Sequence, residues 1–299
     1  MTKKNTEKKT VAEIVTQRFI DALEQDQIPW LRPWDMWTSW SRNTGNDYQG
    51  ANLLTLSGGE YVTFKQAKEE GIKIEKGAKS EMIVKYTEYK KTINKEDLNK
   101  AENLLRYRTE DIEDLGNGKV KVPARSVRYY NVFNVEEYTD AEIKHQHANT
   151  RHEWDAIEKA EEIANGYIER SGLDVKTATN QPSYHPTGHY IETGRKEQYT
   201  NPAEYYSTMF HEMIHSTKKA LGRPQAARQG DKTYAREELV AEIGAAYIMS
   251  YLGIESDYTI ENSKAYVQSW IKNLKDDPNA ILWAAPKAIE AANLVMSIH

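Results

Sequence analysis

Apolar positions near the start of the chain repeat with the period of an α-helix. The repeat covers residues 11–23, and spacings of three and four residues place these side chains on one face. Thr10 and Glu13 match a capping box, in which each side chain binds the backbone N–H of the other. Because Pro29 follows shortly, we expect the helix to end near Asp26.

The rest of the N-terminal half mixes short helices with strands. The pattern predicts helices from about residue 52 and over 63–71, and strands over 81–86 and 128–135. Residues 88–120 are densely charged and carry few large apolar side chains. We interpret them as an exposed excursion that is partly helical around 97–105.

Helical periods dominate the C-terminal half. We expect helices over 153–169, from 202 onward, and over 234–252, 260–275 and 279–298, with short strands and turns in 172–200. Asn201 and Pro202 suit the N-cap and first position of the second helix. The polar stretch 137–150 separates the halves. The sequence predicts an α+β protein of two domains, an α+β domain at 1–140 and a mainly helical one at 141–299.

The C-terminal half contains the pattern His-Glu-Met-Ile-His at residues 211–215. On a helix, His211 and His215 project from one face, where two imidazoles can bind one tetrahedral Zn²⁺. Glu212 follows the first histidine, where it can deprotonate a metal-bound water. The pattern predicts a zinc-dependent peptidase site with Glu212 as the catalytic residue.

A third protein ligand is expected from the predicted helix 234–252, whose acidic residues are spaced by four. Glu238 is our choice as ligand, and Glu242 on the same face would then hydrogen-bond a ligand imidazole. The two roles could be exchanged, and Glu237 is a rival ligand. An oxyanion donor is also needed. The candidates are Tyr184, Tyr190, Tyr199 and Tyr234, which the sequence does not rank.

Other histidines offer weaker metal patterns. His145, His147 and His152 form a rival cluster in the polar stretch between the halves. His185 and His189 are separated by Pro and Gly, which excludes a helical pair. We interpret this second pair as surface or cleft histidines.

Composition limits the remaining chemistry. The 299 residues include no Cys, which excludes disulfides, thiolate metal ligands and a cysteine nucleophile. Net charge is −5, and residues 1–140 carry 23 basic and 23 acidic side chains, so any nucleic-acid surface must be local. Neither a signal peptide nor a membrane span is expected, and the cytoplasm is the predicted location.

Four of the seven tryptophans lie between residues 30 and 40. Trp30, Trp34, Trp37 and Trp40 are interrupted by prolines and accompanied by Arg32 and Arg42, which favours a loop or irregular strand. They are consistent with a small core beneath a loop. They are also consistent with a surface on which unpaired bases stack, and Lys65, Lys76 and Lys79 agree with single-strand binding.

Several motifs together resemble one known family. In the N-terminal half they are Ile28-Pro29-Trp30, Pro33-Trp34, Tyr48-Gln49-Gly50-Ala51-Asn52-Leu53-Leu54, Thr63-Phe64-Lys65-Gln66-Ala67, Lys76-Gly77 and Tyr130-Asn131-Val132-Phe133-Asn134-Val135. In the C-terminal half they are residues 205–215 and Glu237-Glu238-Leu239-Val240-Ala241-Glu242. From residue 11 to 298 the chain resembles the ArdC-type antirestriction family, which joins a single-stranded-DNA-binding domain to a zincin-like metallopeptidase domain.

The resemblance implies a mobile-element protein that protects incoming single-stranded DNA, with a host protein as a potential peptide substrate and no membrane partner. Carried onto this chain, the DNA-binding residues would be Trp30, Arg32, Trp34, Arg42, Tyr48, Asn52, Lys65, Lys76 and Lys79. Ser216-Thr217-Lys218-Lys219 stands where the family usually has Trp-Thr-Gly-His, which puts the cleft shape and substrate choice in doubt.

Two other functions compete with a DNA-tethered peptidase. One is a single-stranded-DNA-binding protection module whose zinc site is structural or inactive. The other is a metal-dependent nuclease or phosphoesterase, which would usually need more carboxylates around its ions than Glu238 and Glu242 supply.

Overall fold

The computed structural model describes residues 9–25, 27–30, 39–99, 111–145, 155–177, 182–199, 201–224, 231–254 and 257–298, with backbone alone at 99 and 257–266. These residues form two compact units. The larger one comprises residues 1–81 and 131–299, and the smaller one comprises residues 82–130. The fold is α+β, as the sequence predicts.

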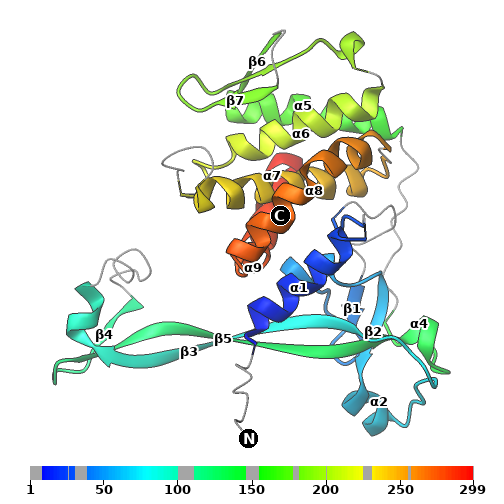
Figure 1. The fold of residues 1–299 in the computed structure, drawn as a ribbon, viewed down its shortest axis with the longest axis vertical. Coiled ribbons are helices and arrows are strands. Elements are labelled where there is room, and N and C mark those ends of the chain that lie inside the picture. Colours follow the sequence, from blue (N-terminus) through cyan, green and yellow to red (C-terminus); the bar gives the residue numbers. More distant parts are fainter. Residues whose placement is uncertain are drawn as a thin grey trace, which may run out of the picture. The chain divides into compact units, whose positions relative to one another are not determined.

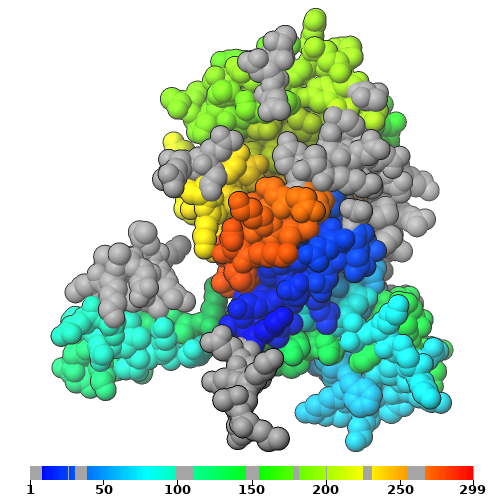
Figure 2. Space-filling model, in the orientation of Figure 1, coloured from blue at the N-terminus to red at the C-terminus, as the bar shows by residue number. Residues whose placement is uncertain are grey.

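The first helix of the larger unit, α1 (Val11–Leu23), starts as predicted. The Thr10 hydroxyl accepts from the Glu13 N–H at 3.2 Å, and the Glu13 carboxylate accepts from the Thr10 N–H at 2.6 Å. The helix ends at Leu23, three residues before the expected end. It packs against α8 (Asp257–Asp276), and Figure 2 shows the two surfaces, blue and orange, side by side.

The N-terminal region contains a mixed β-sheet. Its order is β1-β2-β5-β3, where β1 (Ser39–Ser41) runs parallel to β2 (Gly59–Thr63), and β2 runs antiparallel to β5 (Lys119–Asn134). Helix α2 (Phe64–Glu70) follows β2 and confirms the prediction for 63–71, since Thr63 and Gln66 form a second capping box. The helix expected from about residue 52 is a short 3-10 helix, η1 (Gly50–Leu54).

Helices make up most of the C-terminal region (Figure 1). They are α5 (Ala156–Ser171), α6 (Pro202–Ser216), α7 (Lys232–Tyr251), α8 and α9 (Ala280–Met296). Helix α7 contacts both α6 and α9, and its residues from Leu239 to Met249 are largely buried. At Gly244 an added Cβ would lie 2.9 Å from Ile214 Cδ1 and 3.2 Å from the Ala288 carbonyl oxygen, so glycine permits the close approach.

A second, three-stranded sheet covers part of α6. Its order is β6-β8-β7, with β6 (Asp174–Thr177) parallel and β7 (Ser183–His185) antiparallel to the central β8 (Tyr190–Thr193). Helix α6 contacts both β7 and β8. The short strands predicted for 172–200 therefore bring one sheet edge beside the histidine motif.

The smaller unit corrects the interpretation of residues 88–120. Strand β3 extends from Glu81 to Asn94, and β5 begins at Lys119, so both strands run far beyond the predicted 81–86 and 128–135. Between them lie η2 (Lys95–Asn99) and β4 (Glu113–Asp114), and residues 100–110 are outside the described part. The prediction failed because β3 is exposed on both faces beyond Val84, apart from the half-buried Lys91 and Ile93, which removes the apolar alternation that marks a strand.

The domain boundary near residue 140 remains a prediction. The two compact units are divided at other positions, after residues 81 and 130. Among the described helices, none is both long enough and apolar enough to cross a bilayer.

Candidate metal centre

Helix α6 holds the two motif histidines with their ring nitrogens facing each other. Asn201 caps the helix by accepting from the Glu204 N–H at 2.9 Å, and Pro202 occupies its first turn, as predicted. His211 Nε2 and His215 Nε2 lie 3.2 Å apart. Two nitrogens bound to one tetrahedral Zn²⁺ at about 2.0–2.1 Å would be separated by about 3.3 Å. The spacing therefore suits a shared ion.

Helix α7 brings a carboxylate to the same point. Glu238 Oε2 lies 3.8 Å from His211 Nε2, and Glu238 Oε1 lies 3.6 Å from His215 Nε2. One ligand atom from each of these three residues lies within 4.8 Å of the others. Glu237 and Glu242 contact the Nδ1 sides of the rings instead. The geometry favours Glu238 as third ligand, with Glu237 and Glu242 behind the histidines.

The Nδ1 atoms have acidic neighbours. His215 Nδ1 lies 3.4 Å from Glu237 Oε1, and His211 Nδ1 lies 3.8 Å from Glu242 Oε1. A carboxylate at Nδ1 fixes the ring orientation and makes Nε2 a better ligand. This is the role we expected for Glu242, although its distance exceeds that of a direct hydrogen bond.

Arg223 is a buried part of the centre that the sequence did not reveal. Its guanidinium donates to both carboxylate oxygens of Glu237, at 2.8 and 3.1 Å. It also donates to the Thr217 hydroxyl and the Ile214 carbonyl oxygen, both at 2.8 Å. The side chain is 1% exposed. Arg223 therefore fixes Glu237, which contacts His215. Its loop position gave no periodic signal that could have identified it.

Glu212, the predicted proton acceptor, lies on α6 next to His211. The residue is buried, and its carboxylate accepts a hydrogen bond from the backbone N–H of Tyr184 in β7. Burial raises the pKa of Glu212, and the charges of His215 and His185 act in the opposite direction. A carboxylate with a raised pKa is suited to accept and return a proton.

Burial and neighbouring charges shift the pKa values of three residues in the centre. Burial, together with the neighbouring His215, lowers the pKa of His211 to about 3. Burial opposes protonation of His215, but the hydrogen bond to Glu237 and the nearby carboxylates raise its pKa overall. Burial and the charge of Glu238 raise the pKa of Glu242 to about 7. Glu237, Glu238 and Glu242 thus lie around the two imidazoles with Glu212 beside them, and among the described residues only Glu237 is paired with a guanidinium, that of Arg223. A divalent cation would balance the negative charge of these carboxylates.

The tyrosines considered as oxyanion donors and the histidines of the weaker metal patterns make other contacts. Tyr184 and Tyr199 hydroxyls are bonded to His189 Nδ1 at 2.9 Å and Thr193 Oγ1 at 2.7 Å. His185 stacks on Tyr190 with ring centroids 4.5 Å apart. These contacts assign no oxyanion donor among the four tyrosines. His145 Nε2 bonds the Arg42 carbonyl oxygen, and His147 and His152 lie outside the described residues.

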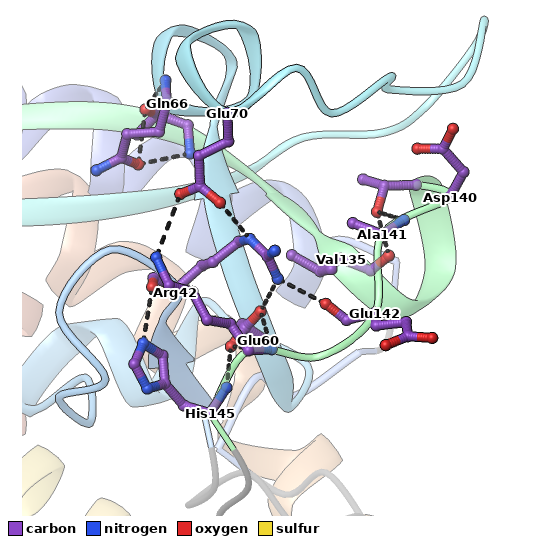
Figure 3. Close-up of polar contacts among 12 residues, drawn as sticks. Arg42, Glu60, Gln66, Glu70, Val135, Asp140, Ala141, Glu142 and His145 are labelled. Carbon is purple, nitrogen blue, oxygen red and sulfur yellow. Dashed lines mark hydrogen bonds and ion pairs between the residues drawn. The ribbon is translucent and has the colours of Figure 1, made fainter.

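Two residues predicted to bind DNA are in fact internal. Trp30 is 1% exposed and packs against Phe19 and, edge-on, against Trp270. Arg42 is buried, donating to Glu60 at 2.6 Å, Glu70 at 2.9 Å and the Glu142 carbonyl oxygen at 2.7 Å (Figure 3). Neither side chain can contact a base or phosphate, which corrects the prediction for these two residues. Trp30 belongs to a core, one of the two interpretations of the tryptophan segment.

The other predicted DNA contacts differ in exposure. Arg32 and Trp34 lie outside the described residues. Tyr48 is half-buried with its ring edge-on to Tyr61, and Asn52 is half-buried in η1. The lysines 65, 76 and 79 are exposed, and Lys65 lies 3.7 Å from Glu69. These three lysines remain available as phosphate contacts.

The paired histidines, the helix-borne carboxylate and the neighbouring sheet define a zincin-like metallopeptidase domain, and the family model of that description matches residues 160–287. A second model, the N-terminal domain of anti-restriction factor ArdC, matches residues 9–135. The chain belongs to the ArdC antirestriction family.

Solved structures of a relative extend over nearly the whole chain. The crystal structures of antirestriction ArdC protein from plasmid R388, metal-free and Mn(II)-bound, are 29% and 30% identical to it. Each superposes with a TM-score of 0.65 and covers 97% of this chain and 98% of the other.

Curated relatives include much longer proteins. Two DNA primases TraC from Escherichia coli are 29% identical over 98% of this chain, which spans only 20% and 27% of their lengths. The uncharacterized protein y4eC of Sinorhizobium fredii is 25% identical, over 95% of this chain and 90% of its own length.

Proposed function

We propose that this chain is an antirestriction protein that binds single-stranded DNA and hydrolyses peptides at a zinc centre, protecting mobile-element DNA on entry to a host. The observation that carries the peptidase part is the convergence of His211 Nε2, His215 Nε2 and Glu238 within 4.8 Å. Buried Glu212 on the same helix is the proton acceptor such a centre needs.

The donor set fits a divalent cation. Two imidazoles and one carboxylate form a common ligand set of catalytic zinc, which leaves a position for water. The same nitrogen and oxygen donors also bind Mn²⁺, and the relative from plasmid R388 was crystallised with Mn(II). Zinc is our proposal because the neutral imidazole pair favours it over the harder Mn²⁺.

The chain's own residues would divide the chemistry as follows. A bound metal would polarise a peptide carbonyl and acidify water. Glu212 would accept a proton from that water and return it to the departing amine. Glu237, held by Arg223, would keep His215 in position. The N–H of Tyr184 would keep Glu212 in place.

Family membership supports the DNA-binding part, since the N-terminal model covers residues 9–135. The exposed lysines 65, 76 and 79 are phosphate contacts in this proposal. A cytoplasmic location and a host protein substrate are parts of the same proposal.

The first test measures metal content and affinity for single-stranded DNA on the same preparation. We expect about one zinc per chain, lost in His211→Ala with DNA affinity unchanged. His145→Ala is the matched control, because this histidine lies outside the ligand set, and it should retain the metal. A native chain that holds no metal after dialysis against zinc would overturn the peptidase proposal and leave the DNA-binding part standing.

Glu212→Gln separates peptidase from binding module. Hydrolysis of a labelled unfolded protein should fall at least about 100-fold while zinc is retained. The alternative, a DNA-protecting module with a structural zinc, predicts full protection of DNA by Glu212→Gln and loss of protection in Lys76→Ala.

A further inference from the structure

The smaller unit contains four exposed tyrosines on two neighbouring strands. Tyr86 and Tyr89 in β3 are 43% and 49% exposed, and Tyr129 and Tyr130 in β5 are 44% and 39% exposed. Burial usually favours such large rings, so their exposure within one short unit is unusual. Figure 1 shows β3 and β5 running side by side as a long ribbon.

Ion pairs define one face of this ribbon. Arg125 of β5 pairs with Glu88 of β3 at 2.7 Å, and Glu113 pairs with Lys90 at 3.3 Å and Lys121 at 3.4 Å. Because side chains alternate along a strand, Tyr86 shares this face with Glu88 and Lys90. Tyr129 shares it with Arg125. We call this set the ion-paired face.

The opposite face has the complementary alternation. Between Ile83 and Val122, which are buried, it presents Lys85, Thr87, Tyr89 and the half-buried Lys91 from β3, and Ala124, Ser126, Arg128 and Tyr130 from β5. These residues include three cations and no acid. Among the described residues, Lys85, Lys91 and Arg128 make no ion pair within 4.0 Å, in contrast to Lys90, Lys121 and Arg125. We call this set the basic face.

We propose that the basic face of residues 82–130 binds single-stranded DNA, with Tyr89 and Tyr130 stacking on bases and Lys85, Lys91 and Arg128 contacting phosphates. The proposal rests on the DNA-binding part of the proposed function and assigns it a surface. Charge complementarity favours a polyanion, because none of the three cations has an acidic partner within 4.0 Å in the part of the chain that the structure describes. The exposed rings favour unpaired bases over a duplex, whose bases are already stacked.

The dimensions agree with a short stretch of nucleic acid. Lys85 and Lys91 are six residues apart on one strand, which corresponds to about 20 Å at a rise of about 3.3 Å per residue. Tyr89 lies between them. Cations flanking an aromatic platform form the arrangement by which proteins hold single strands without reading their sequence.

The ion-paired face supplies a matched control within the same ribbon. The full chain is titrated against a labelled oligothymidylate of about 20 nucleotides, and binding is followed by fluorescence anisotropy. Tyr89→Ala combined with Tyr130→Ala should weaken binding at least about 10-fold, the loss expected from two stacking rings. Tyr86→Ala combined with Tyr129→Ala should leave affinity within about twofold. All four rings are exposed, so both double variants should fold.

Two further variants separate stacking from charge, and a duplex competitor tests the preference for single strands. Tyr89→Phe combined with Tyr130→Phe should bind as the native chain does, because phenylalanine also stacks. Lys85→Ser, Lys91→Ser and Arg128→Ser together should lower the slope of log affinity against log salt by about 2, at about 0.7 per phosphate contact. Duplex DNA of the same length should compete poorly.

Each outcome decides the proposal. Equal losses in the two alanine pairs, or no loss in either, would overturn it while native binding upholds the DNA-binding function. A native chain that fails to bind the oligonucleotide would remove both. Loss in the serine variant but not in Tyr89→Ala with Tyr130→Ala would show a polyanion surface without stacking, contrary to the proposal.

Discussion

Two buried arginines organise two different clusters in this protein. Arg42 donates to Glu60, Glu70 and the Glu142 carbonyl oxygen (Figure 3). Arg223 donates to Glu237, Thr217 and the Ile214 carbonyl oxygen. Both side chains are almost inaccessible, and both join segments that are distant in sequence or held in different elements. The two clusters differ in the groups that surround each guanidinium.

The Arg42 cluster satisfies its own polar groups. Glu60 also accepts from the backbone N–H groups of Lys144 and His145 and from the Trp40 indole. Burial alone would raise the pKa of Glu60, but these donors and Arg42 hold it below its usual value. The cluster fixes residues 142–145 against the sheet and leaves no ligand position.

In the Arg223 cluster, the guanidinium is paired with only one of the neighbouring carboxylates, that of Glu237. Beyond Glu237 lie two imidazole nitrogens at 3.2 Å and the carboxylates of Glu238, Glu242 and Glu212, with no further guanidinium among the described residues bonded to them. The comparison shows that a buried charge is not by itself a sign of function. Two imidazole Nε2 atoms that face each other, with several carboxylates around them, indicate the site.

Among the predicted substitutions, Arg223→Met should have the largest effect, and it distinguishes the two arginine clusters. Removing the guanidinium leaves Glu237 buried beside His215, which should lower the free energy of unfolding by about 3–5 kcal/mol. Zinc affinity should fall about 10–100-fold, because Glu237 no longer fixes His215. Denaturant titration and competition with a chelator measure the two quantities. Unchanged zinc affinity would show that Arg223 is purely structural.

Arg42→Met is the corresponding change in the satisfied cluster. We expect a loss of about 2–4 kcal/mol in the free energy of unfolding, since Glu60 keeps its backbone donors. Zinc affinity should match that of the native chain. A parallel fall in zinc affinity would contradict the division into a structural and a functional cluster.

Gly244→Ala tests packing behind the metal centre without touching a charge. The added Cβ would meet Ile214 and the Ala288 carbonyl oxygen, and we expect a net loss of about 1–2 kcal/mol in unfolding free energy after the helix-propensity gain. Gly166→Ala is the matched control, because its Cβ would meet only the end of the Arg170 side chain, which can shift while the guanidinium keeps its hydrogen bond to the Val295 carbonyl oxygen. That variant should be as stable as the native chain or slightly more stable by thermal unfolding.

Asn201→Ala should give the smallest effect. The change removes the N-cap of α6 and should cost about 1 kcal/mol of unfolding free energy. Zinc affinity should be unchanged, because the histidines lie more than two helical turns farther along. A measurable decrease in zinc affinity would show that the start of α6 helps to position the ligands.

Local patterns predicted those elements whose signals are local. The capping box at Thr10, the short helix from Thr63 and the start of α6 at Asn201–Pro202 were predicted from the sequence and agree with the structure. The strands β3 and β5 were predicted too short, because charged side chains on both faces erase the alternation on which the prediction depends. The tryptophan segment allowed two interpretations, and for Trp30 packing against Trp270, distant in sequence, decided between them.

The sequence by itself predicted the candidate metal centre, because two histidines four residues apart on a helix need no tertiary contact to share a face. It also narrowed the third ligand to three glutamates on one helix. Only the tertiary structure distinguished them, since the approach of α7 to α6 places Glu238 at the Nε2 atoms and Glu237 and Glu242 at the Nδ1 atoms. Tertiary contacts also bury Arg223 beside α6 and α7 and, separately, Arg42 against Glu60 and Glu70. Burial depends on which chain segments meet, a property that no local pattern contains.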